Sequence, residues 1–281
     1  MSQGRIAFQG ELGANSHEAC LAAFPDLEPV PCATFEEAFE AVKSGDCQLG
    51  MIPVENSIAG RVADVHHLLP SSGLKIVGER FKPIHFQLMA NPGVKLEDLK
   101  TVASMPIALA QCRKTVKRLK LRTEGVGDTA GAARMLGQNP DPTRAAISPA
   151  LAAEIYGLEI LARDIEDEHS NTTRFLIMTA EKAPKPPPFT APCITSFTFK
   201  VRNIPAALYK AMGGFATSGV NISKLESYME GGAWTATFFY AEADGRPEDR
   251  GLALAFEELG FFAEKFEILG VYPADPFRTR G

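Results

Sequence analysis

Apolar residues in the first part of the chain fall into two alternating patterns, which predict strands and helices in turn. Short apolar runs such as Arg5–Phe8 and Gln48–Pro53 are typical of strands. Between them, Phe35–Lys43 has apolar residues at helical spacing on one side. The alternation continues as far as a strand expected at Phe175–Met178. This order predicts an α/β fold with parallel sheets covered by helices, in which ligands bind beyond the carboxyl ends of the strands.

Two further helices are expected, each directly after a strand. Ser16 is a residue that readily caps a helix, and it predicts a helix from this point to Phe24. Ile107–Leu119 is expected to form one continuous helix, which Ser104 precedes and which carries Gln111. Both helices follow expected strands, so their amino ends are expected near a ligand site.

The last third of the chain has a different order of elements. Its six segments read, in chain order, as strand, helix, strand, strand, helix and strand. The expected segments are Thr195–Val201, Pro205–Ser218, Val220–Met229, Trp234–Glu242, Pro247–Leu259 and Phe266–Val271. The resulting βαββαβ order predicts a ferredoxin-like domain.

A cluster of prolines separates these two parts. Ala183–Pro188 contains four prolines, which neither a helix nor a central strand tolerates. We therefore expect a first domain at residues 1–182, a linker at 183–192 and a second domain at 193–273.

Composition and charge exclude several classes of function. The net charge is −5 and the isoelectric point is near 5.7, which argues against a nucleic-acid partner. The basic stretch Arg113–Arg122 has helical spacing; it is either a solvated helix face or a region that attracts an anionic substrate. No apolar run approaches the length of a membrane span, and the amino terminus has no signal-peptide pattern. The five scattered cysteines suit buried thiols in a reducing compartment. We therefore expect a cytoplasmic protein with no membrane partner.

Familiar cofactor and metal motifs are absent from the sequence. There is no His-Glu-x-x-His pattern, and the adjacent His66 and His67 point away from each other on a helix. Gly125–Gly131 follows an expected strand, but its glycine spacing departs from the dinucleotide fingerprint. A helix start that binds some other anion, or none, fits this segment better. We expect neither a cofactor nor a metal.

Three polar loops remain as candidate sites. Pro53–Gly60 follows a strand and offers a carboxylate, an amide and a hydroxyl, although Asn and Ser also serve as ordinary caps of turns. Ser104 precedes the helix that carries Gln111, and it could be a plain cap. Asn171–Phe175 combines an amide, two hydroxyls and a guanidinium, which could hold a carboxylate or pair with nearby acidic residues.

Together these loops resemble the signatures of the prephenate dehydratase family. Asn171–Phe175 is similar to the family's Asn-x-Thr-Arg-Phe motif, and Pro53–Gly60 resembles a second motif. Ser104–Cys112 and Phe8–Ser16 resemble two more, in family order. There are departures: the first motif lacks its usual threonine, for which Asn15 and Ser16 can substitute, and Met105 replaces a frequent histidine.

The resemblance implies conversion of prephenate to phenylpyruvate, with loss of water and carbon dioxide, without a cofactor. It implies a two-lobed domain like that of periplasmic binding proteins, with one lobe at about 1–80 and 165–182 and the other at about 81–164. The implied catalytic residues are Thr173, Asn171, Arg174, Glu55 and Gln111. The implied substrate-binding residues are Asn56, Ser57, Asn15, Ser16, Ser104, Asp128 and Phe175. Thr173 is expected to assist departure of the ring hydroxyl.

The second domain resembles an ACT domain, which implies regulation by L-phenylalanine in a homodimer or homotetramer. Ala206 stands where the similar motif has glycine, and Tyr228 and Met229 replace Arg-Pro. The implied effector-binding residues are Asn203, Pro205, Ala206, Ala207, Leu208, Asn221, Ile222, Leu225, Glu226 and Ser227. Two alternatives remain: a dehydratase that prefers arogenate, and a ligand sensor without catalysis.

Overall fold

The computed structural model describes residues 4–182, 191–229 and 236–279. Contacts between residues divide the chain into two units. The first consists of Met1–His66 and Arg80–Leu176, and the second of His67–Glu79 and Ile177–Gly281. The proline cluster lies outside the described residues, so the linker remains a prediction.

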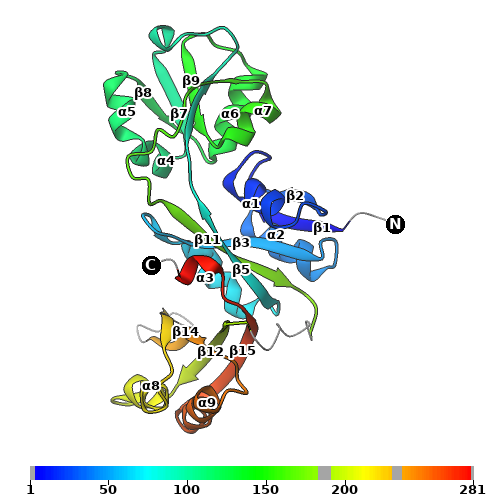
Figure 1. Ribbon diagram of the computed structural model, residues 1–281, viewed down its shortest axis with the longest axis vertical. Helices are drawn as coiled ribbons and strands as arrows, with labels where there is room; N and C mark the ends of the chain where they lie inside the picture. The colour runs from blue at the N-terminus through cyan, green and yellow to red at the C-terminus, as the bar shows by residue number, and fades with distance from the viewer. Residues whose placement is uncertain (1–3, 183–190, 230–235, 280–281) are drawn as a thin grey trace. The chain divides into compact units, whose positions relative to one another are not determined.

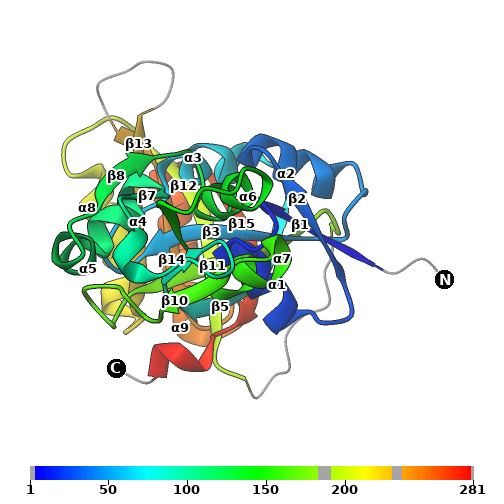
Figure 2. The same cartoon turned by 90° about the horizontal axis from the view of Figure 1, so that it is seen from above.

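A six-stranded sheet forms one lobe (Figure 1). The division of the chain into units falls inside two strands of this sheet, β5 and β11. Its strand order is β2-β1-β3-β11-β5, with β4 paired to β3. The strands are β1 (Arg5–Gln9), β2 (Glu28–Cys32), β3 (Leu49–Asn56), β4 (Gly60–Arg61), β5 (Lys75–Pro83) and β11 (Thr172–Thr179). Its helices are α1 (Asn15–Ala23), α2 (Phe35–Lys43) and α3 (Ala63–Leu68), followed by a 3-10 turn at Leu69–Ser71. Helix α2 packs against β1, β2 and β3 (Figure 2).

A five-stranded sheet of order β10-β6-β9-β7-β8 forms the other lobe of the first unit. Its strands are β6 (Gln87–Ala90), β7 (Thr101–Ser104), β8 (Arg122–Gly125), β9 (Arg144–Ser148) and β10 (Glu159–Ala162). Its helices are α4 (Pro106–Gln111), α5 (Arg113–Arg118), α6 (Thr129–Gln138) and α7 (Ala150–Tyr156), with a 3-10 turn at Leu96–Asp98. The chain passes between the two sheets twice, at residues 84–86 and again at residues 163–171.

The expected α/β architecture is confirmed, with corrections to the sheets. Strand β1 runs parallel to β2 and β3, and β7 runs parallel to β8 and β9. Strand β6 is instead antiparallel to β9 and β10, so the second sheet is mixed. Strands β2, β4 and β10 were not expected. The sequence of β2 contains two prolines, which an edge strand tolerates because one side needs no hydrogen bonds.

Both helix expectations with defined bounds need correction. Helix α1 begins after Ala14, and Ser16 is its buried second residue. The turn before the helix is instead closed by His17, whose Nδ1 accepts a hydrogen bond from the Gly13 N–H at 2.9 Å. The helix expected at Ile107–Leu119 is interrupted at Cys112, where α5 starts anew.

A tertiary contact accounts for the second helix start. The carboxylate of Asp167, distant in sequence, accepts a hydrogen bond from the Lys114 N–H at 3.0 Å. This contact satisfies a free donor in the first turn of α5. Periodicity within Ile107–Leu119 could not reveal the break, because its partner lies in another segment.

The carboxyl-terminal part has the predicted βαββαβ order. Its elements are β12 (Cys193–Val201), α8 (Ala207–Thr217), β13 (Ile222–Met229), β14 (Ala236–Asp244), α9 (Arg250–Phe262) and β15 (Ala263–Pro273), followed by a 3-10 turn at Pro276–Thr279. The sheet order β13-β14-β12-β15 is antiparallel throughout and ferredoxin-like. Trp234, the expected start of β14, lies outside the described residues.

Aromatic residues fill the core beneath the two helices of this part. Phe197 on β12 stacks on Phe215 of α8 at a centroid distance of 5.7 Å and meets Phe256 of α9 edge-on at 5.1 Å. Such pairs add to the stabilisation from burial of apolar area. Within the ranges that the structure describes, every helix is too short or too polar to cross a membrane.

Candidate functional site

A cavity of about 510 Å³ lies within the first unit and is lined by both lobes. The six-stranded lobe contributes the start of α1, the end of β3, β4 and the start of β11. The five-stranded lobe contributes α4 and the start of α6. Seven of the predicted site residues line it: Asn15, Ser16, Asn56, Gln111, Asp128, Thr173 and Phe175.

Four neutral polar side chains form a continuous hydrogen-bonded chain at this cavity. Asn56 Nδ2 donates to Thr173 Oγ1 at 2.9 Å and to Asn171 Oδ1 at 2.7 Å. Asn171 Nδ2 in turn donates to Gln111 Oε1 at 3.1 Å. Gln111 belongs to one lobe and Asn56 to the other, so the chain links the lobes through the returning segment. All four were predicted site residues, and they come from three segments that lie more than 50 positions apart in sequence.

The orientation of the Asn56 amide follows from its other contacts. Its Oδ1 accepts hydrogen bonds from the backbone N–H groups of Ile58 at 3.0 Å and Ala59 at 2.8 Å. The Nδ2 group must therefore face Thr173 and Asn171. Because Thr173 Oγ1 receives this hydrogen bond, the hydroxyl hydrogen of Thr173 is available to donate elsewhere. Thr173 lines the cavity, so a ligand oxygen there can accept that hydrogen bond.

Ser57 holds together the two loops that carry this chain. Its backbone N–H donates to the Thr172 carbonyl at 2.8 Å, and its Oγ accepts from the Thr172 N–H at 2.9 Å. The Ser57 hydroxyl also donates to the Ser170 carbonyl at 3.0 Å. Ser57 is not part of the cavity lining, so its binding role remains a prediction and its contacts are structural.

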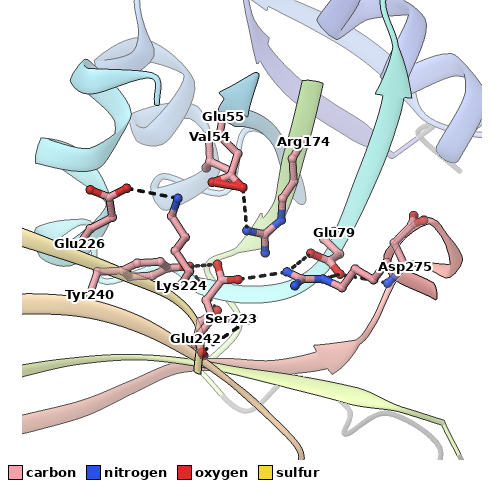
Figure 3. A network of polar contacts seen from close by, with 12 residues as sticks. Val54, Glu55, Glu79, Arg174, Ser223, Lys224, Glu226, Tyr240, Glu242 and Asp275 are labelled. Atoms are coloured by element: carbon pink, nitrogen blue, oxygen red, sulfur yellow. Dashed lines mark hydrogen bonds and ion pairs between the residues drawn. The ribbon is translucent and has the colours of Figure 1, made fainter. Parts of the chain in front are cut away.

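Glu55 and Arg174 face each other, and neither belongs to the cavity lining. Their closest charged atoms, Arg174 Nη1 and Glu55 Oε1, are 3.6 Å apart (Figure 3). Arg174 is buried, and its guanidinium lies 5.8 Å from the centre of the Phe81 ring. The geometry therefore gives Arg174 a role in holding the strand, and catalytic roles for this pair remain predictions.

Ser104 is fully buried at the end of β7. Its hydroxyl donates to the Ile147 carbonyl on the neighbouring strand β9 at 2.7 Å. The side chain thus contacts the sheet, and Met105 lines the cavity in its place. The substrate-binding role predicted for Ser104 stays a prediction.

Asp128 is the N-cap residue of α6 and lines the cavity. Its Oδ1 accepts from the Gly131 N–H at 2.8 Å. Burial raises the pKa of this carboxyl, and the hydrogen bonds from Gly131 and Ala130 offset that rise only in part. Gly10 approaches closely from the other lobe: a Cβ added there would lie 3.2 Å from Asp128 Oδ2, and Gly10 has a φ of +118°. A second cavity of about 530 Å³ shares Asp128 in its lining.

Sequence reasoning missed one cationic residue in the lining. Arg61 follows Gly60 in the short strand β4 and, among the described lining residues, is the single basic one. Gly60 has a φ of +82°, which permits the turn that brings β4 back against β3. Arg61 directly follows the Pro53–Gly60 motif in sequence, and this position could have identified it as a candidate site residue.

The predicted effector residues lie on two segments of the second unit. The loop residues Asn203, Pro205 and Ala206 are exposed before α8, where Ala207 is buried and Leu208 packs at the core edge. The others lie on or beside the edge strand β13: Asn221, Ile222, Leu225, Glu226 and Ser227. Asn221 Nδ2 donates to Asp244 Oδ2 at 2.8 Å, and Glu226 pairs with Lys224 at 3.3 Å. An effector role for these residues remains a prediction.

Comparison with known proteins gives matches across nearly the whole chain. The family model for prephenate dehydratase matches residues 6–183. A bifunctional N-acyl-homoserine lactone acylase/prephenate dehydratase of Komagataeibacter europaeus is 48% identical over 98% of both chains. Arogenate dehydratase 2 of Petunia hybrida is 38% identical over 98% of this chain and 73% of the relative. The solved structure of a prephenate dehydratase from Arthrobacter aurescens in complex with L-Phe is 31% identical, has a TM-score of 0.87, and covers 96% of this chain and 90% of the other.

Proposed function

Because the chain belongs to the prephenate dehydratase family, we propose that it converts prephenate to phenylpyruvate by decarboxylating dehydration. In this reaction the bond from the ring to its carboxylate breaks, and its electron pair enters the ring. The C4–oxygen bond breaks, and the oxygen leaves as water after taking up a proton. Carbon dioxide is the other product, and formation of the aromatic ring drives the step.

The observation that carries this proposal is the orientation of Thr173. Asn56 donates to the Thr173 oxygen, which leaves the threonine proton free to reach a leaving hydroxyl in the cavity. A threonine hydroxyl is a weak acid, so its contribution is a positioned hydrogen bond that strengthens as negative charge develops on the oxygen. Exclusion of water by the two lobes would strengthen that bond further.

The substrate has two carboxylates that must be treated differently, and the cavity lining offers them one arginine beside two acidic residues, Asp64 and Asp128. Arg61 can hold the side-chain carboxylate. The ring carboxylate must lose its charge to leave as carbon dioxide, so a tight ion pair there would oppose the reaction. Gln111 and Asn15, which are neutral, can contact that group without trapping it. The raised pKa of Asp128 makes it a second candidate proton donor.

The direct test is incubation of the purified chain with prephenate and, separately, with arogenate. Formation of phenylpyruvate from prephenate supports the proposal, and absence of turnover with both substrates would point to the sensor alternative. Formation of phenylalanine from arogenate at higher kcat/KM would favour the arogenate alternative, to which the similarity to the Petunia hybrida enzyme lends weight.

A parallel incubation with an N-acyl-homoserine lactone tests a second activity. The Komagataeibacter europaeus relative carries the acylase name beside the dehydratase name. Release of the free amine and fatty acid would indicate that the same chain also acts on acyl amides. Competition between prephenate and the lactone would then report whether both reactions use the cavity that Thr173 lines.

We further propose that L-phenylalanine regulates the enzyme through the ferredoxin-like domain of a homodimer or homotetramer. The support is the order of elements, the resemblance to an ACT domain, and the L-Phe complex of the Arthrobacter aurescens relative. Binding can alter turnover only if the effector prefers one conformation of the enzyme over another. Titration calorimetry with L-phenylalanine, paired with inhibition assays, tests this; no heat and no inhibition would rule it out.

A further inference from the structure

The two segments that connect the lobes lie side by side. The Ile84 N–H donates to the Asn171 carbonyl at 2.9 Å, and the Ile165 N–H donates to the Phe86 carbonyl at 2.9 Å. Buried Ile84 and Phe86 line the substrate cavity, whereas His85 between them is exposed. Any change in the angle between the lobes must pass through these paired segments, which we call the hinge (residues 84–86 and 163–171).

Four potential metal ligands gather on the exposed side of the hinge. The ligand atoms of His85, Asp164 and Glu166 all lie within 4.8 Å of one another. His85 Nδ1 is 2.8 Å from Glu166 Oε1 and 3.8 Å from Asp164 Oδ1. His169 Nδ1 lies 3.6 Å from the same Glu166 oxygen. The first connecting segment supplies one ligand, and the returning segment supplies three.

These separations suit a tetrahedral metal ion. With bonds of about 2.0–2.1 Å, ligand atoms around Zn²⁺ are about 3.3 Å apart. The three separations of 2.8, 3.6 and 3.8 Å lie on either side of this value. The ligand atoms of His85, Asp164 and Glu166 are already close to one another, and the exposed side chain of His169 would turn toward them to complete the coordination. Two imidazoles and two carboxylates form a mixed set of nitrogen and oxygen ligands. Such a set binds Zn²⁺ and similar ions better than Mg²⁺, which takes oxygen ligands.

The two carboxylates are held in place before any ion binds. Glu166 is buried, with its side chain 1% exposed, and its Oε2 accepts from the Phe86 N–H at 2.9 Å, which leaves Oε1 toward the histidines. Asp164 exchanges two hydrogen bonds with the side chain of Gln87, each 3.1 Å long. Asp164 also has a φ of +49°, a left-handed conformation that costs a non-glycine residue free energy. Such outer contacts are the ones that orient metal ligands.

We propose that His85, Asp164, Glu166 and His169 form a binding site for one divalent transition-metal ion, Zn²⁺ in particular, at the hinge. The sequence predicted no metal, because the motifs that reveal such sites have short spacings and His85 is about 80 positions from its partners. An ion bound here would join both connecting segments and restrict the movement of one lobe against the other. It would act on the hinge from outside the cavity, so it need not take part in the chemical step.

Equilibrium dialysis of the full-length chain against Zn²⁺ tests the site without substrate. We expect one Zn²⁺ per chain, with affinity at least about 10-fold weaker in His85→Ala and in Asp164→Asn. Both side chains are half exposed or more, so these variants should fold as the parent does. His67→Ala removes an exposed histidine outside the hinge and is the matched control. Absence of saturable binding, or equal affinity in all three variants and the parent, would overturn the proposal.

A second measurement asks whether the ion acts on the lobes. It rests on the proposed dehydratase function, whereas dialysis does not, so the two failures can be told apart. Addition of Zn²⁺ should change the rate of prephenate turnover in the parent chain and in His67→Ala, but not in His85→Ala. An equal response in all three chains, or none in any, would show that an ion at the hinge does not influence closure.

Discussion

The cavity of the first unit and the carboxyl-terminal part of the chain each contain a connected polar network, but the two networks are built from different groups. At the cavity the network is neutral: two asparagines, a glutamine and a threonine. In the second unit it is charged. Arg278 contacts Glu79 through two nitrogens, at 2.6 and 2.9 Å, and Glu242 at 3.0 Å. Tyr240 also donates to Glu242 at 2.6 Å, and Figure 3 places Tyr240 and Glu79 on either side of Glu242.

This difference in charge determines what each network can do. Glu79 and Glu242 are fully buried, so each requires its partner arginine to offset the loss of hydration. The cavity network carries no charge, and loss of one member leaves only a dipole unpaired. We therefore expect changes in the charged network to reduce stability and changes in the neutral one to reduce rate.

Arg278→Ala should have the largest effect. Removal of the guanidinium leaves two buried carboxylates without their shared partner, which should lower the free energy of unfolding by about 3–5 kcal/mol. Arg144→Ala is the control, because Arg144 pairs with the half-exposed Glu124 at the surface and should lose at most about 1 kcal/mol. Denaturant unfolding followed by circular dichroism measures both. Equal losses in the two variants would contradict the charged-network interpretation.

Thr173→Ala should lower kcat for prephenate by about 10²-fold or more with a smaller change in KM, because the lost hydrogen bond forms chiefly in the transition state. Thr173→Ser keeps the hydroxyl and should retain most of the activity. Thr172→Ala, on the neighbouring residue whose backbone contacts Ser57, is the matched control and should change turnover little. Near-normal turnover in Thr173→Ala would remove Thr173 from the mechanism.

Asn56→Asp should lower kcat by about 10-fold, since one positioned proton is redirected. The substitution keeps the shape of the side chain but replaces the donor amide by an acceptor oxygen. The introduced carboxylate would then compete with the ligand for the Thr173 hydroxyl hydrogen, which is still present, so the loss is smaller than in Thr173→Ala. A role confined to substrate binding would raise KM and leave kcat unchanged, so steady-state kinetics separate the two roles.

Ala206→Gly should have the smallest effect, and it should stabilise the protein instead of destabilising it. Ala206 has a φ of +61°, so glycine there should raise the free energy of unfolding by about 1 kcal/mol. Ala216→Gly, at an exposed position inside α8, should instead lower it by up to about 1 kcal/mol. Thermal unfolding of both variants tests the pair. Destabilisation by Ala206→Gly would mean that the left-handed conformation is not retained in solution.

Much of the candidate site followed from local sequence. Asn56, Asn171 and Thr173 came from two polar loops and Gln111 from the helix after Ser104, and the resemblance to the prephenate dehydratase family implied their roles. The structure brings all four into one hydrogen-bonded chain. Local sequence was less informative for Ser104, whose hydroxyl contacts a neighbouring strand, because that contact depends on strand order. Strand order is a property of the whole sheet.

The sequence by itself determined the alternation of strands and helices, the βαββαβ order and the polar loops, because these depend on the spacing of side chains along a few turns or strands. The tertiary structure decided that Thr173 Oγ1 accepts a hydrogen bond from Asn56, where the helix after Pro106 breaks, and that His85 meets Glu166. Each of those features depends on partners more than 50 positions away. Hydrogen-bond partners and clusters of charged groups depend on distances in space between segments that are far apart in sequence. The spacing of apolar residues along the chain does not reveal them.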